Sequence, residues 1–200
     1  EYDTVYHEHL SYFHVAPLTV LFAQVGMEVF DVKRVPTHGG SIRVYAGRAG
    51  RHPTTAALRE LTNRESERLT DAGAVFAAFA GRVEAQRVAL RELLGELRSK
   101  GTRLAGYGAT AKGNTMLNYC GIDADTLTFI ADTTPYKQGL LTPGMHIPVR
   151  PESAVDEERI EVMLLLAWNY ADAIVRRMTA YVGRGGRFIH PIPLPRLIPE

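Results

Sequence analysis

The sequence predicts an α/β fold in which residues 102–200 form a parallel sheet with crossover helices. From Thr102 onward, short apolar runs alternate with helical patterns, which is typical of such sheets. A glycine-rich turn separates the first apolar run from the helix that follows it, as in phosphate-binding folds. A long amphipathic pattern and a small helix–strand–strand pattern come before these residues. We therefore expect three segments, 1–50, 51–101 and 102–200.

The composition is that of an ordinary globular chain and excludes several classes of protein. Of the 200 residues, 46% are hydrophobic, and the formal net charge is +1. This charge does not fit a nucleic-acid-binding surface, and a single cysteine, Cys120, excludes a disulfide framework or a thiolate zinc site. No apolar run approaches the roughly 20 residues of a membrane span, and no signal peptide precedes the first pattern. We expect a cytoplasmic protein without nucleic-acid or membrane partners.

Segment 1–50 has the pattern of one helix and two strands. Apolar residues recur at helical spacing over 17–25, and 27–35 and 41–46 alternate between apolar and polar residues. Proline and paired glycines between the two strands predict a turn. Because this unit is too small to fold alone and the chain begins inside a patterned segment, we expect it to be the end of a larger α/β domain.

Segment 51–101 is predicted to consist of linking helices. Helical patterns cover 55–69 and 72–100, and the second carries an apolar stripe among arginines and glutamates. Lys100 and Gly101 are residues that commonly end a helix. The expected role of these helices is packing.

Segment 102–200 supplies the strands and helices of the main sheet. A helix is expected from the glycine-rich turn to Cys120, and a Pro- and Gly-rich loop covers 133–148. The expected strands are 103–107, 127–131, 147–150, 162–167 and 187–190, and the further helices are 153–158 and 171–182.

The first dozen residues contain a run of proton-carrying side chains, Tyr6-His7-Glu8-His9. A histidine has an ordinary pKa near ~6.5 and exchanges a proton near neutral pH, and an adjacent carboxylate can orient it. Tyr6 and His9 share a face if the segment is helical, and His7 and His9 share one if it is extended. Either geometry allows proton transfer. A polar, aromatic cap on a domain edge remains the alternative.

The turn Gly106-Tyr107-Gly108-Ala109-Thr110-Ala111 has the spacing of a dinucleotide-binding loop. Free N–H groups at the start of the following helix favour an anion, and Lys112 adds a positive charge. Ligands of such sheets bind outside the carboxyl ends of the strands. Other polar residues expected at this edge are Asn114, Asp132, Lys137, Gln138 and Asn169, and His38 is a further ligand-facing possibility. A tight turn without a ligand remains the alternative.

Five motifs in order resemble a known family. They are 6–13, 37–44, 106–114, 137–139 and 143–148, and together they cover nearly the whole chain. They resemble the carboxyl-terminal half of the S-adenosylmethionine-dependent nucleotide-sugar C-methyltransferases. In that family a zinc-binding module and a methyltransferase core precede a Rossmann-like domain. The resemblance implies that 1–50 is the last helix and two strands of a class I methyltransferase sheet, carrying the base motif. It also implies that 102–200 is a Rossmann-like nucleotide-sugar-binding domain.

The resemblance implies a reaction as well as a fold. The intact enzyme would transfer a methyl from S-adenosylmethionine to the carbon beside the ketone of a dTDP-4-keto-deoxysugar in antibiotic biosynthesis. His9 would be the base, Tyr6 would hydrogen-bond the sugar or the developing oxyanion, and Glu8 would orient the base or a sugar hydroxyl. The implied substrate-binding residues are Gly106, Tyr107, Gly108, Ala109, Thr110, Lys112, Asn114, Asp132, Lys137, Asn169 and His38.

Two parts of the family are missing from this sequence. These are the cysteine cluster of the zinc module and the glycine loop that grips S-adenosylmethionine, so we expect a fragment that is inactive alone and holds no metal. Two other functions remain open, a non-catalytic nucleotide-binding module and an NAD-dependent oxidoreductase based on the glycine loop and Asp132. A metal hydrolase using His7 and His9 lacks an evident third ligand.

Overall fold

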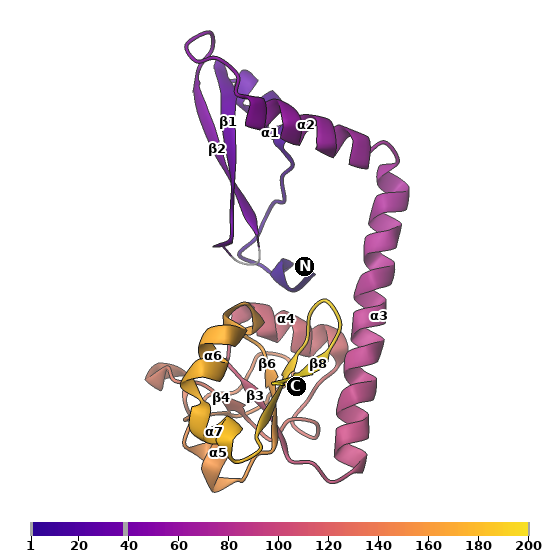
Figure 1. Cartoon of the computed structure of the whole chain (residues 1–200), viewed down its shortest axis with the longest axis vertical. Coiled ribbons are helices and arrows are strands. Elements are labelled where there is room, and N and C mark those ends of the chain that lie inside the picture. The colour runs from indigo at the N-terminus through magenta and orange to yellow at the C-terminus, as the bar shows by residue number, and fades with distance from the viewer. Residues whose placement is uncertain (1, 38–39, 200) are drawn as a thin grey trace. The chain divides into compact units, whose positions relative to one another are not determined.

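The computed structural model describes residues 2–37 and 40–199, which fall into two compact units (Figure 1). Unit 1 contains residues 2–8 and 81–199, and the described part of unit 2 contains residues 9–37 and 40–80. The long helix α3 (Ala72–Ser99) contributes residues to both units. The units are described separately below.

The centre of unit 1 is a six-stranded sheet with the order β5-β4-β3-β6-β7-β8. The pairs from β5 through β7 are parallel, and β8 runs antiparallel to β7. The strands are β3 (Leu104–Tyr107), β4 (Ile130–Ala131), β5 (Val149–Arg150), β6 (Val162–Leu165), β7 (Arg187–His190) and β8 (Arg196–Ile198). This mostly parallel sheet confirms the predicted α/β class. The chain order reverses between β3 and β6, and ligands of such sheets bind at this reversal.

Short helices connect the parallel strands. They are α4 (Ala111–Cys120), α5 (Ala154–Glu157), α6 (Ala171–Arg177) and α7 (Thr179–Gly183), with 3₁₀ turns η1 (Tyr2–Thr4), η3 (Pro135–Lys137) and η4 (Trp168–Tyr170). The connection through α4 leads from β3 toward the β5 edge of the sheet. The connection through α6 and α7 leads from β6 toward the β8 edge. Because such crossovers are right-handed, α4 covers one face and α6 and α7 cover the other.

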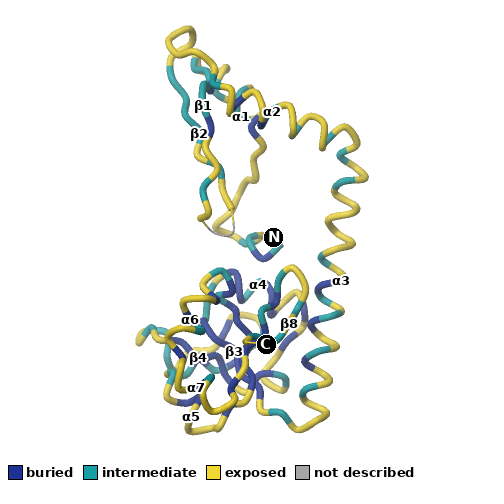
Figure 2. Tube along the Cα trace, viewed as in Figure 1, coloured by how far each residue is buried: buried dark blue, intermediate teal, exposed yellow. Residues whose placement is uncertain are grey.

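The core of unit 1 lies on the central strands (Figure 2). All four residues of β3 and all four of β6 are buried, as expected for parallel strands with both faces covered. The second half of α3 packs against this core through Leu90 and Leu94. Arg91 also donates a 2.6 Å hydrogen bond from Nη1 to the carbonyl oxygen of Cys120 at the end of α4.

The structure of unit 1 differs from the prediction at three places. The strand expected at 127–131 is limited to β4, although the backbones of Thr128 and Phe129 already hydrogen-bond to Leu104 and Gly106 of β3. The helix expected at 171–182 is divided at Met178, whose φ of −93° and ψ of 40° are not helical. Strand β8 was not predicted, because the prolines around it argue against a strand.

Unit 2 packs two helices against a hairpin. Its elements are α1 (Val15–Ala23), β1 (Met27–Val35), β2 (Ser41–Arg48), α2 (Ala56–Arg68) and the start of α3. The strands pair antiparallel as a separate two-stranded sheet. The buried apolar residues of this unit are Val15, Val29, Val32, Leu58 and Leu61. The side chain of Thr55 caps α2 and donates a 2.7 Å hydrogen bond to Asp31. The helix and hairpin predicted for 1–50 are thus present.

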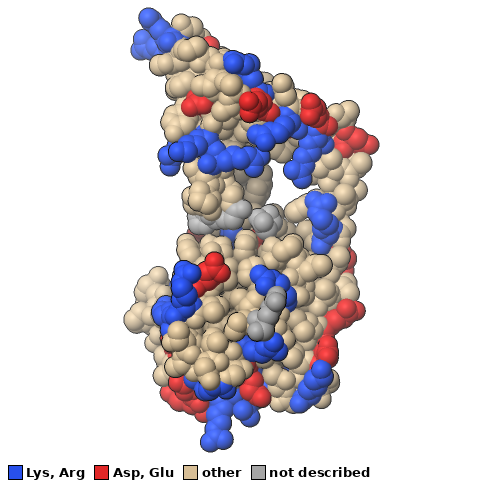
Figure 3. Space-filling view, in the orientation of Figure 1, with Lys and Arg blue, Asp and Glu red and all other residues tan. Residues whose placement is uncertain are grey.

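Charged side chains of both signs are present on the face shown in Figure 3, and the described helices include none that could span a membrane. Basic and acidic side chains are interspersed over the face of each unit in Figure 3. None of the helices within 2–37 and 40–199 is both long and apolar enough to cross a membrane. In the same ranges, no three His, Cys, Asp or Glu side chains are grouped to hold a metal ion.

Candidate functional site

The site is built on the tight turn between β3 and α4. Gly108 has a φ of +89°, and a Cβ at this position would lie 2.9 Å from the Cβ of Ala167. Both the backbone angle and the space therefore require glycine. The turn ends at Thr110, whose side chain accepts a 3.0 Å hydrogen bond from the amide of Gly113 and donates one of 3.2 Å to the carbonyl oxygen of Leu166. These contacts start α4 at a fixed place beside β6.

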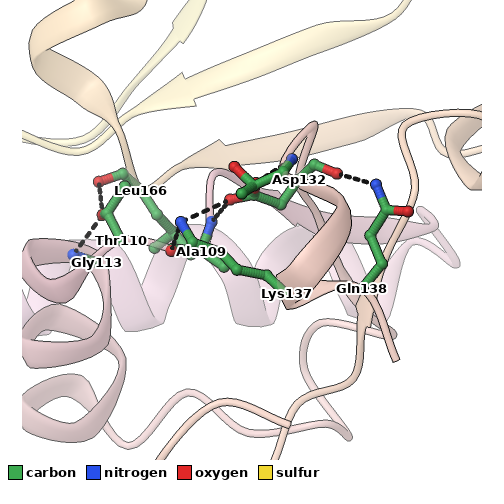
Figure 4. Close-up of polar contacts among 8 residues, drawn as sticks. Ala109, Thr110, Gly113, Asp132, Lys137, Gln138 and Leu166 are labelled. Atoms are coloured by element: carbon green, nitrogen blue, oxygen red, sulfur yellow. Dashed lines mark hydrogen bonds and ion pairs between the residues drawn. The ribbon is translucent and has the colours of Figure 1, made fainter. Parts of the chain in front are cut away.

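Asp132, at the end of β4, braces this turn (Figure 4). Its carboxylate accepts hydrogen bonds from the backbone amides of Ala109, at 2.7 Å, and Thr134, at 2.8 Å. The ammonium of Lys137 lies 3.5 Å from the same carboxylate and donates to the carbonyl oxygen of Ala109 at 2.8 Å. Burial disfavours the charged carboxylate, but the hydrogen bonds from Thr134 and Ala109 and the charge of Lys137 outweigh it and lower the pKa of Asp132. Asp132 therefore holds the loop as a carboxylate.

A cavity of about 370 Å³ opens beside this turn, within unit 1. One wall is the start of α4, another is the loop after η3, and Tyr6 and His7 of the amino-terminal segment complete the lining. The lining residues are Tyr6, His7, Ala109, Thr110, Ala111, Asn114, Thr115, Leu117, Lys137, Leu140, Leu141, Thr142, Pro143, Val149 and Leu166. A mostly apolar pocket of this size with a few polar groups is typical of a small-molecule site.

The polar groups of the cavity lie close to the start of α4. The Oδ1 atom of Asn114 is buried and has no hydrogen-bond partner among the described residues, so a ligand donor would satisfy it. Lys137 brings a positive charge, and the first amides of α4 add the positive end of the helix dipole. The cavity therefore suits a ligand that combines an anion with apolar and hydrogen-bonding parts.

The predicted site residues fall into separate groups in the structure. Those that line the cavity are Tyr6, Ala109, Thr110, Asn114 and Lys137. Behind it, Gly106, Tyr107 and Gly108 are buried, and Asp132 braces the loop. The Tyr107 hydroxyl donates a hydrogen bond to Glu152.

The remaining predicted residues lie elsewhere. Lys112 is buried, with its ammonium 5.0 Å from the centre of the Trp168 ring. Asn169 lines a different hollow of about 400 Å³, together with Trp168 and His190. Glu8 is exposed at the end of the unit 1 segment, and His9 is exposed and belongs to unit 2. The prediction for His38 lies outside the described residues.

Sequence reasoning did not select several lining residues. His7 was weighed only as a partner of His9, and Leu117, Leu140 and Leu141 have no chemistry that marks them in a sequence. The available signal was the pair of motifs at 137–139 and 143–148, which flank the loop that forms one wall. Apolar lining residues of this kind can be identified only from the folded loop.

Two comparisons with known proteins agree with one another. Residues 36–193 match the family model described as the C-methyltransferase C-terminal domain. The chain is 40% identical over 200 residues to C-methyltransferase NovU of Streptomyces niveus. The aligned region covers 99% of the chain and 47% of NovU. The chain thus spans about half the length of this curated relative. A match over most of the chain and this identity establish that the chain belongs to the C-methyltransferase family and contains its carboxyl-terminal domain.

Proposed function

We propose that the chain is the nucleotide-sugar-binding half of an S-adenosylmethionine-dependent C-methyltransferase. The substrate is a dTDP-linked 4-keto-deoxysugar, and the carbon beside its ketone receives the methyl. The reaction belongs to antibiotic biosynthesis in the cytoplasm. The name of the relative, C-methyltransferase NovU, supports the class of reaction.

One observation carries the proposal: the amino-terminal motif and the start of α4 line one cavity. Tyr6 and His7 come from the Tyr-His-Glu-His run, and Thr110 and Asn114 come from the glycine loop and its helix. A diphosphate at the start of α4, close to Lys137, would leave the sugar near the motif. The apolar lining would accept the deoxygenated parts of the sugar or the thymine ring.

The chain's own residues would supply the proton chemistry. His9 removes the proton from the carbon beside the ketone, since an imidazole is basic near neutral pH. Tyr6 donates a hydrogen bond to the oxygen on which negative charge develops, and Glu8 orients the base or a sugar hydroxyl. S-adenosylmethionine supplies an electrophilic methyl when bound, and its main binding motif is absent from this chain. We propose that the chain alone is inactive for this reason.

The geometry of Asp132 argues against the NAD-dependent oxidoreductase. A dinucleotide loop uses an acid after the second strand to hold the ribose hydroxyls. Here both oxygens of that acid accept backbone hydrogen bonds, and its side chain is only 7% exposed. The backbone amides therefore already occupy the carboxylate oxygens that would bind the ribose hydroxyls.

Binding of dTDP to this chain tests the site. At a concentration a hundredfold above Kd, a ligand of the folded state stabilises it by about 2.7 kcal/mol, and we expect a matching rise in Tm with dTDP but not with NAD. Lys137→Met should abolish the rise. Lys100→Met, at an exposed lysine paired with Glu96, is the matched control and should keep it. Equal stabilisation by NAD and dTDP would refute the proposed ligand.

Proton exchange in the full-length enzyme tests the base. His9→Ala should abolish both methyl transfer and solvent exchange at the sugar carbon, while dTDP affinity stays unchanged. A non-catalytic binding module predicts no effect of this substitution. If exchange persists at the wild-type rate in the variant, the base is another residue.

A further inference from the structure

A buried hydrogen bond joins the amino-terminal segment to the sheet of unit 1. The indole Nε1 of Trp168 donates to Oδ2 of Asp3 at 2.6 Å, across 165 positions of sequence. Asp3 is fully buried, and Trp168 is 9% exposed at η4, just beyond the end of β6. A hydrogen bond to a buried carboxylate is among the stronger kinds, and loss of its donor leaves a buried charge poorly satisfied.

Three further contacts, all made by Tyr2, hold the same turn. The hydroxyl of Tyr2 donates a 3.0 Å hydrogen bond to Oε1 of Gln86 on α3, and it lies 3.6 Å from the sulfur of Cys120 on α4. The ring of Tyr2 also packs against that of Tyr119, with centroids 5.1 Å apart. The turn η1 therefore contacts α3, α4 and η4 at once.

Asp3 lies three positions before Tyr6, the first residue in the chain that lines the cavity. The backbone amides of Val5 and Tyr6 donate to the carbonyl oxygens of Tyr2 and Thr4, at 2.9 and 3.1 Å, so the turn fixes the direction in which the chain continues. Tyr6 and His7 then line the cavity. The side chains of Val5, His7 and Glu8 are exposed, so their burial contributes little to holding this part of the segment in place.

We propose that Asp3 is a positioning residue that, through Trp168, holds the Tyr6–His7 segment against the nucleotide-sugar cavity. Asp3 is not among the residues that line the cavity, so it acts only through the segment it anchors. The inference rests on the proposed function for its catalytic consequence. The anchoring itself is independent of any reaction.

The anchor is tested first in the chain itself by ¹H–¹⁵N NMR spectroscopy. Trp168 is the single tryptophan, so its indole N–H gives one signal. Asp3→Ala should shift this signal and speed its exchange with solvent, and the amide signals of residues 5–8 should move to unstructured positions. Asp125→Ala removes an exposed carboxylate and should change neither. If residues 5–8 keep their wild-type signals in Asp3→Ala, the anchor is refuted.

The catalytic consequence is tested in the full-length enzyme, well below its Tm. Asp3→Ala should lower kcat on the order of 100-fold, the cost of a displacement of about 1 Å, with dTDP affinity within twofold of wild type. Trp168→Phe, which keeps a ring but has no N–H, should lower kcat in the same way. A purely structural role predicts unchanged kcat in the folded fraction, and that result would overturn the inference. Absence of methyl transfer by the wild type, with the NMR result intact, would instead refute the proposed function.

Discussion

The carboxylate of Asp132 joins the turn before α4 to the loop after β4, because it accepts hydrogen bonds from the amides of Ala109 and Thr134. The sequence predicted that Asp132 follows the second strand of segment 102–200, and in the structure it directly follows β4. The direction in which the Asp132 side chain points could not be predicted from the sequence. It depends on the amides of Ala109 and Thr134, which come close to the carboxylate only when the loop is folded. The same holds for Lys112, whose ammonium lies over Trp168, a residue 56 positions away in sequence.

Asp132→Asn should destabilise the protein by roughly 2 kcal/mol at neutral pH, because one amide N–H would lose its carboxylate acceptor. The pKa of Asp132 is lowered on folding, so its charge stabilises the protein above the unfolded value of 3.8. This stabilisation is lost as the pH falls below 3.8 through the folded pKa. Urea unfolding of both proteins between pH 7 and pH 2.5 measures the difference, which should shrink with acidification. A difference that is constant with pH would contradict a charged Asp132.

Gly108→Ala should destabilise the protein by about 2–4 kcal/mol, from the cost of the left-handed backbone and the contact with Ala167. Gly95→Ala is a matched control, because Gly95 is inside α3 with open space around its Cβ position. That control should be neutral or stabilising by about 0.5–1 kcal/mol. Thermal unfolding of the two variants measures both effects, and similar Tm values would contradict the strain assigned to Gly108.

Elements with strong local signals were predicted well. Strand β3, helix α4 and helix α3 have ends within a few residues of those expected, because apolar periodicity and end signals agree there. The division at Met178 and strand β8 were missed. Met178 has non-helical backbone angles inside an otherwise helical sequence pattern. Strand β8 pairs with β7 across a short proline-containing connection, residues 191–195, which carries no strand signal of its own.

The first turn of α4 depends on Thr110. Thr110→Ala should cost about 1 kcal/mol of stability, because the amide of Gly113 loses its cap. Thr110→Ser keeps the hydroxyl and should retain most of that stability. Because the capped turn also forms a wall of the cavity, the alanine variant should bind dTDP more weakly. Chemical denaturation and dTDP titration measure the two effects, and equal stability of both variants would contradict the capping role.

At the scale of the whole molecule, the two units differ in the size of their cores. Among the described residues, unit 2 has a core of five buried apolar side chains and a two-stranded sheet, whereas unit 1 has a larger core around six strands. Two-stranded sheets with little apolar burial are marginally stable. Residues 2–8 pack with unit 1, a contact that no local pattern in the sequence indicates.

Hydrogen exchange should therefore separate the units. The amides of β1 and β2 should exchange through a low-energy opening, and those of β3 and β6 should exchange only with global unfolding. The two sets of amides can be compared in one native-state experiment with increasing denaturant. A single shared opening energy for both sheets would contradict this prediction.

The contact between Tyr2 and the one cysteine has a practical consequence. Cys120 is fully buried, and burial raises the pKa of its thiol, so both access and ionisation oppose its alkylation. Lifting of the amino-terminal turn would remove the neighbour that lies on this sulfur. The rate at which a maleimide labels Cys120 in the native chain would then report how often the amino-terminal turn opens, without an introduced cysteine.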